Sequence, residues 1–75
     1  MQIQEILSRD PEVMSGAVVF KGTRVPVSGL FDYLSAGDTL DVFLADFPTV
    51  ERKQAEAAIR LAGQDLERLM DKWAA

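Results

Sequence analysis

The sequence at residues 37–62 is GDTLDVFLADFPTVERKQAEAAIRLA, and its pattern predicts a short helix, a tight turn and a longer helix. Thr39, or Asp38 before it, is the candidate N-cap of the short helix. Asp41 in its first turn suits the positive end of the helix dipole. Pro48 ends the helix, because the residue before a proline is pushed out of the helical region. This order is typical of a helix-turn-helix, whose second helix can enter the major groove of DNA.

Basic and amide side chains open the second helix of this pair. The candidate DNA-binding residues are Arg52, Lys53 and Gln54, with Arg60 two turns further on. Arginine and lysine pair with guanine edges and glutamine with adenine, so these residue types fit base recognition. The alternative is the solvated face of an amphipathic helix, which Glu51 and Glu56 favour by diluting the positive charge. On pattern alone the solvated face is the more frequent outcome.

Upstream, two short apolar runs flank a polar turn. Residues 17–20 (AVVF) predict a strand, and residues 25–27 (VPV) predict its hairpin partner across the turn Lys21, Gly22, Thr23, Arg24. Pro26 lacks an N–H, so its strand should be an edge or should end there. The turn presents two cations and a hydroxyl, which suit a phosphate or an acidic partner, although a solvated hairpin turn has the same composition.

The remaining elements are a preceding helix and an N-terminal segment. Ser28 is the candidate N-cap of a helix over 29–36, and Gly37 is expected to end it with a positive φ. Ile3, Ile6 and Leu7 predict either a helical turn or a strand.

From about residue 50 onward the apolar spacing predicts one long helix. The helical periodicity of the apolar residues continues across Gly63, although glycine weakens a helix interior by about 1 kcal/mol relative to alanine. A break at Gly63, with Asp65 capping a separate helix, is the alternative. The last turns carry an apolar stripe of Leu66, Leu69, Met70 and Trp73. We expect the stripe to be a protein interface, with packing on the chain's own core as the alternative.

Composition restricts the class of protein. The chain has 75 residues, 48% of them hydrophobic, which is enough for one domain. It has no cysteine and no histidine, so disulfides, Cys/His zinc sites and Ser-His-Asp triads are excluded. A core of this size rarely supplies more than about 3–5 kcal/mol, so we expect a homodimer.

The number and placement of the charged residues argue against an enzyme and against a protein that binds DNA non-specifically. Twelve acidic and eight basic residues give a net charge of −4. The carboxylates suit capping and solvation, and no phosphate-binding loop is present, so we expect no enzyme, metal or cofactor. The N-terminus has no cationic segment followed by an apolar one, and no apolar run could span a bilayer, so we expect a cytoplasmic protein.

Four ordered motifs of the sequence resemble a known family. They are DPEVMSG at 10–16, VFKGTRVPV at 19–27, LSAGDT at 34–39 and DFP at 46–48. Together they resemble the small prokaryotic family called domain of unknown function 433, over roughly residues 3–62. Glu51 and Ala55 depart from its usual cap hydroxyl and large aliphatic residue, which predicts looser docking of the following helix by about 1 kcal/mol.

The resemblance implies a fold and a function. The expected fold is mostly α, a three- to four-helix winged-helix or homeodomain-like helix-turn-helix with a short N-terminal β-hairpin. One domain would span 1–75, with a β element at 1–27, a tri-helical core at 28–62 and a helical extension at 63–75. The family is similar to VapB-like antitoxins, which neutralise a PIN-like ribonuclease toxin and bind operator DNA. The alternative is a protein-interaction or dimerisation module without DNA binding. Lys21, Gly22, Thr23, Arg24 and Pro26 correspond to the family's signature turn.

Overall fold

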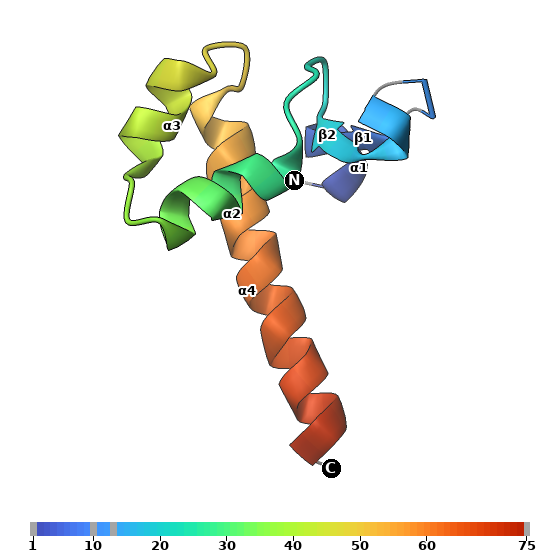
Figure 1. The fold of residues 1–75 in the computed structure, drawn as a ribbon. Helices are drawn as coiled ribbons and strands as arrows, with labels where there is room; N and C mark the ends of the chain where they lie inside the picture. Colours follow the sequence, from blue (N-terminus) through green and yellow to red (C-terminus); the bar gives the residue numbers. More distant parts are fainter. Residues whose placement is uncertain (1, 10, 13, 75) are drawn as a thin grey trace.

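A computed structural model describes residues 2–9, 11–12 and 14–74 of the chain. Within them the chain forms a small helical head from which one long helix projects (Figure 1). The elements, in chain order, are α1 (Ile3–Ile6), β1 (Leu7–Arg9), a 3-10 turn η1 (Met14–Gly16), β2 (Val18–Phe20), α2 (Val27–Ser35), α3 (Leu40–Asp46) and α4 (Arg52–Ala74). The expectation of a mostly helical chain with a small antiparallel sheet near its N-terminus is confirmed.

The strand partner differs from the predicted one. β2 pairs antiparallel with β1, with Leu7 opposite Phe20 and Arg9 opposite Val18. The predicted partner, 25–27, makes only a single bridge from Pro26 to Val19. Proline has no N–H to extend the ladder, so the pairing stops there and α2 begins at the next residue. The N-terminal segment is therefore both of the predicted alternatives in turn, a helical turn followed by a strand.

The start of α2 was predicted two residues too late. Pro26 is the N-cap residue, with φ of −63°, and Ser28 lies inside the first turn without capping it. The end of the helix matches the prediction. Gly37 has φ of +93°, its N–H donates to the Leu34 carbonyl at 3.1 Å, and Asp38 N–H donates to the Tyr33 carbonyl at 3.0 Å. This pair of hydrogen bonds is a Schellman motif, which satisfies the last carbonyls of the helix.

The start of α3 is also as predicted. Thr39 is the N-cap, and its hydroxyl oxygen accepts a hydrogen bond from the Val42 N–H at 3.2 Å. Asp41 occupies the first turn, and Phe47 follows the last helical residue immediately before Pro48.

Two glycines give a matched test of these helix features. Gly37→Ala places a side chain at a positive φ and should cost about 1–2 kcal/mol of unfolding free energy. Gly63→Ala lies in a helix interior with open space around the new methyl group and should add about 0.5–1 kcal/mol. Urea denaturation followed by circular dichroism measures both. Shifts of the same sign in the two variants would contradict this assignment of backbone roles.

The hydrophobic core lies in the head, between β2, α2, α3 and the first turns of α4. Its most buried members are Phe20, Leu30, Phe43, Val50, Ala55 and Ala58. Phe43 joins them, with ring-centroid distances of 6.2 Å to Phe20, 5.3 Å to Tyr33 and 5.0 Å to Phe47. Ala55 is fully buried in this core and brings the first turns of α4 into it.

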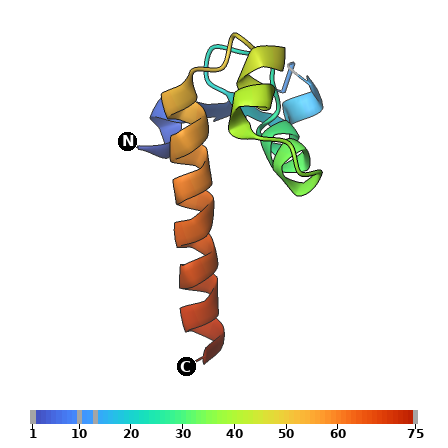
Figure 2. The same cartoon turned by 90° about the vertical axis from the view of Figure 1, so that its left-hand side faces the viewer.

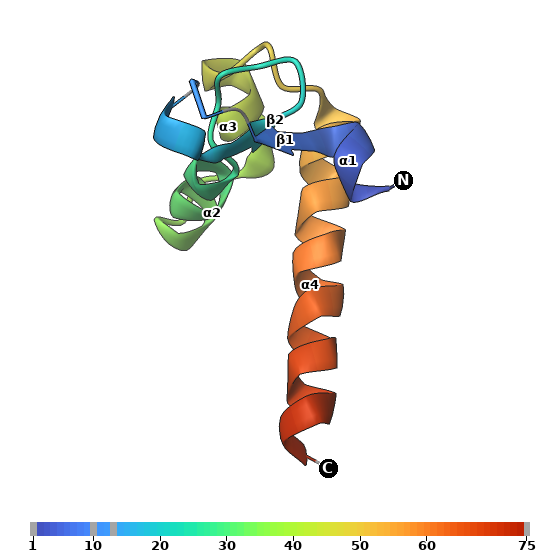
Figure 3. The same ribbon diagram turned by 90° about the vertical axis from the view of Figure 1, so that its right-hand side faces the viewer.

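The second half of α4 projects beyond the head. The helix is continuous from Arg52 to Ala74, so the predicted single helix is confirmed and the break at Gly63 is wrong. Views turned by 90° in either direction show the same free helix, with α2 and α3 beside its N-terminal half only (Figures 2 and 3).

Candidate protein-interaction surface

Gln54 links the first turn of α4 to the signature turn by hydrogen bonds. This side chain is only 8% exposed. Its Oε1 accepts a hydrogen bond from the Glu51 N–H at 3.0 Å, and its Nε2 donates to the Lys21 carbonyl at 3.1 Å. A glutamine reaching back to the N-cap N–H is one half of a capping box. Gln54 therefore supplies this half of the box, while Glu51 lacks the hydroxyl that would form the other half.

This arrangement corrects the prediction that Gln54 reads DNA bases. Its amide oxygen and nitrogen are both occupied inside the molecule, and its side chain is buried. The sequence did hold a signal for this role, namely a glutamine three residues after the cap position. Its link to Lys21, 33 residues away, had no local signal.

The two cations beside Gln54 are exposed and paired with carboxylates. Arg52 forms an ion pair with Asp41 of α3 and lies 3.9 Å from Glu56. Lys53 Nζ lies 3.6 Å from Glu51. Such exposed pairs contribute little to stability, but they lower the net positive charge that DNA would meet. Of the predicted DNA-binding set, Arg60 is exposed and has no ion-pair partner among the described residues.

Hydrogen bonds within the signature turn stabilise its backbone conformation. Gly22 has φ of +80°. The Thr23 hydroxyl donates to the Phe20 carbonyl at 2.8 Å and accepts from the Val25 N–H at 3.0 Å, which closes the turn. Lys21 Nζ donates to the Gln4 carbonyl at 3.3 Å, and Arg24 is exposed. Glycine and threonine here serve the backbone, and the exposed Arg24 side chain is the member of the turn best placed for a partner.

The hydrogen-bonding environment of Tyr33 changes the acidity of its phenol. Its hydroxyl donates to Asp46 Oδ2 at 2.8 Å, linking α2 to α3. This hydrogen bond raises the pKa of Tyr33, with smaller contributions from desolvation and from the charges of Asp46 and Asp38.

A pH titration tests this contact. A raised pKa means that the folded protein favours the protonated phenol, so the hydrogen bond stabilises the fold below pH of about 10 and is lost as pH rises through the shifted value. The sequence has a single tyrosine, so tyrosinate absorbance reports Tyr33 alone. Asp46→Asn should move the midpoint down towards that of free tyrosine. Equal midpoints in the two proteins would show that the contact does not form.

The exposed apolar surface is concentrated on the projecting half of α4. Of the predicted interface residues, Trp73 is 84% exposed, Leu66 68%, Met70 66% and Leu69 44%. The structure thus brings these four onto one free helix surface, which we call the α4 stripe. Packing of the stripe on the chain's own core, the alternative from sequence, is wrong. An exposed set of large apolar side chains of this kind makes the stripe a candidate interaction surface.

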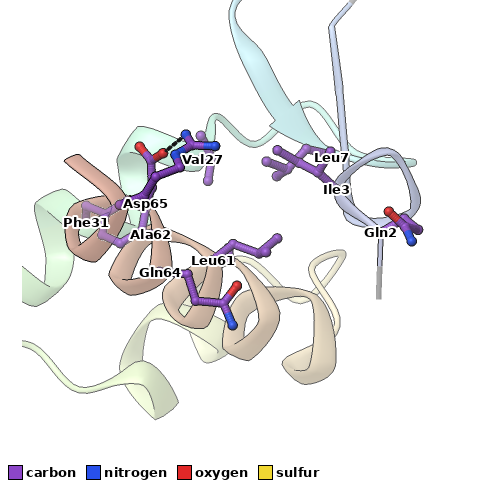
Figure 4. Close-up of a pocket in the computed structure, with 11 residues that line it drawn as sticks. Gln2, Ile3, Leu7, Val27, Phe31, Leu61, Ala62, Gln64 and Asp65 are labelled. Atoms are coloured by element: carbon purple, nitrogen blue, oxygen red, sulfur yellow. Dashed lines mark hydrogen bonds and ion pairs between the residues drawn. The ribbon is translucent and has the colours of Figure 1, made fainter. Parts of the chain in front are cut away.

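An apolar groove of about 690 Å³ opens where the stripe meets the head. Its walls are Leu61 and Ala62 of α4, Val27 and Phe31 of α2, and Ile3 and Leu7 near the N-terminus (Figure 4). Leu61 projects from α4 towards the side formed by Ile3 and Leu7. The groove was not predictable from sequence, because its walls come from three separate segments. Its rim is polar, with Asp65 and Arg68 paired at one end.

The described residues contain no group of three or more acidic, His or Cys side chains placed to hold a metal ion. None of their helices is long and apolar enough to cross a membrane.

The fold and these surfaces define a small helical head bearing an exposed amphipathic helix. The model of the family described as protein of unknown function DUF433 matches residues 3–62, and the chain belongs to this family. A crystal structure of a DUF433 member protein from Anabaena variabilis is similar, with a TM-score of 0.70 and 26% sequence identity. The similarity covers 97% of this chain and 72% of the other. No curated protein matches the sequence.

Proposed function

We propose that this chain is a non-enzymatic, antitoxin-like regulator that acts by binding other proteins. The observation that carries the proposal is the α4 stripe, a set of large apolar side chains on a helix that leaves the head. Trp73 and Met70 are of the types enriched in protein interfaces. The partners we expect are a second copy of the chain and a PIN-like ribonuclease, whose toxicity the complex would suppress by occlusion.

Charge supports a nuclease as one partner. The chain carries a net charge of −4. An acidic protein suits a cleft that binds RNA, because such a cleft is basic or holds metal ions. The same charge, together with the carboxylates around Arg52 and Lys53, makes protein binding the better supported function and DNA binding the second candidate.

Co-purification tests the proposal. The chain, carrying an affinity tag, is expressed with the product of its adjacent gene, and retention and ribonuclease activity are measured. We expect a stable complex in which nuclease activity is suppressed. Leu66→Asp with Leu69→Asp should reduce assembly by at least about tenfold, since each charge is buried at an apolar contact. Asp71→Lys, on the opposite and exposed face of the same helix, is the matched control. Assemblies unchanged by the stripe variant would contradict the proposal.

Operator DNA binding is favoured by one observation, the helix–turn–helix order of α3 and α4 with Arg52, Lys53 and Arg60 on the surface. Its test is a mobility-shift assay on DNA from the upstream region at several salt concentrations. If these cations contact phosphates, affinity should fall steeply with salt, and Arg60→Ala should reduce the slope by about one. Arg52→Ala with Lys53→Ala should weaken binding without lowering the melting temperature. An affinity that is unchanged in both variants would remove DNA binding from the account.

A further inference from the structure

We propose that the α4 stripe binds the α4 stripe of a second copy, with the two helices antiparallel and Trp73 of each copy beside the groove of the other. This inference names the partner of the surface described above, and so rests on the proposed protein-binding function. It goes beyond that function by fixing the occupant, the direction of the helices and the residues that meet.

The shape of the chain indicates that it leaves uncovered a surface large enough for a dimer interface. A compact monomer of 8.3 kDa exposes about 4,600 Å², whereas this chain exposes 5421 Å². The excess, roughly 800 Å², equals what one partner contributes to a standard protein interface. The radius of gyration also indicates an extended shape, since it is 13.2 Å, whereas a compact domain of this length has about 11 Å.

The direction of the helices follows from where the head covers α4. Ala55, Ala62, Leu66, Leu69 and Trp73 are spaced by 7, 4, 3 and 4, so they lie along one strip of the helix. Ala55 is fully buried by the head, whereas Leu66, Leu69 and Trp73 are exposed. A parallel second copy would bring two heads to the same end of this strip, where they compete for one space. An antiparallel copy puts the heads at opposite ends.

The antiparallel register places large residues against small ones. If Leu66 of one copy meets Leu69 of the other, Trp73 lies level with Ala62. Ala62 is a wall of the groove, next to Leu61 and Phe31. The exposed indole would therefore be seated at an apolar opening beside a small side chain, which is the arrangement of an interface anchor.

Charges flanking the strip agree with this register. Asp65, Arg68 and Lys72 lie on one flank of α4, where Arg68 pairs with Asp65. In an antiparallel pair this flank faces the same flank of the second copy, and Asp65 falls between Arg68 and Lys72 of that copy. On the other flank, Glu67 faces Glu67 of the second copy near the symmetry axis. Glu67→Gln should therefore tighten an antiparallel dimer by a few fold, whereas in a parallel pair it would remove an attraction to Arg68.

Sedimentation equilibrium of the purified full chain, over a range from micromolar to several hundred micromolar, is the first test. We expect a monomer–dimer equilibrium. Leu66→Asp with Leu69→Asp should raise the dissociation constant by at least about 100-fold, because a symmetric interface contains each change twice. Asp71→Lys, an exposed residue on the helix face away from the strip, should change it by less than about threefold, as expected of a residue outside the contact. Far-ultraviolet circular dichroism checks that the head stays folded.

Cysteine pairing then tests direction. The chain has no native cysteine, so Ala62→Cys and Trp73→Cys can be made singly and mixed. We expect the mixture to form the 62–73 disulfide, while Trp73→Cys alone does not, because its two thiols lie about 16 Å apart along an antiparallel pair. A self-linked Trp73→Cys dimer overturns the antiparallel arrangement. A wild-type chain that stays monomeric overturns the second copy as occupant. Co-purification would still test binding to another protein independently. Failure of the dimer and failure of the proposed function can therefore be distinguished.

Discussion

Phe43→Ala is expected to leave the head largely unfolded at room temperature. Phe43 is fully buried and its ring contacts Phe20, Tyr33 and Phe47. Phenylalanine-to-alanine changes in a core cost about 3–5 kcal/mol. A core of this size supplies about the same total, so one substitution removes most of the stability. Urea denaturation, followed by circular dichroism at a protein concentration held constant, measures the loss.

Two further variants keep this prediction measurable. Phe43→Leu retains most of the apolar volume and should cost about 1–1.5 kcal/mol, so a transition can still be fitted. Val42→Ala, at the neighbouring position, which is 42% exposed, should change stability by less than about 0.5 kcal/mol. A Phe43→Ala protein with the urea midpoint of the wild type would show that the aromatic cluster is not the centre of the core.

Gln54→Ala is expected to cost about 2–3 kcal/mol, because it leaves the Glu51 N–H and the Lys21 carbonyl without their partner in a partly buried place. The exposed Gln64→Ala is the matched control and should be close to neutral. An equal effect of the two substitutions would contradict the assignment of Gln54 as the residue that fastens α4 to the signature turn.

Gln54→Glu separates the two hydrogen bonds. The carboxylate still accepts from the Glu51 N–H, but it turns a second oxygen towards the Lys21 carbonyl where the amide donated. The variant should therefore be less stable than the wild type at neutral pH. It should recover as the pH falls and the carboxylate is protonated, since the protonated form can donate again. Comparing urea midpoints at acidic and neutral pH, with wild type as reference, gives this difference directly.

Features of the structure that depend on neighbours in the chain were predictable from sequence. Thr39 caps α3, Gly37 ends α2 in a Schellman motif, and α4 continues through Gly63, because each depends on residues within one or two turns. The α4 stripe belongs to this group as well, since helical spacing alone places Leu66, Leu69 and Trp73 together.

Features that depend on distant contacts were not predictable. The partner of β2 is a three-residue strand near the N-terminus, and strands this short carry too little pattern to specify pairing. The start of α2 at Val27 follows from the fixed φ of Pro26, which outweighs the capping preference of Ser28. The hydrogen bond that buries Gln54 joins it to Lys21, 33 residues away, and no local pattern indicates such a contact. Gln54 was therefore expected to face DNA. The groove beside Ala62 likewise requires three segments to be placed together before it exists.

We propose that the second half of α4 is a protein-binding surface and not a helix that functions alone. Amide hydrogen exchange of residues 64–73 tests it most directly, measured on the dilute free chain and again with the chain concentrated or in complex with its co-expressed partner. An isolated helical extension opens easily, so these amides should exchange quickly in the dilute sample, while those of the head stay protected. On association we expect the protection of these amides to rise towards that of the head. Exchange that is equally fast in every state would contradict it.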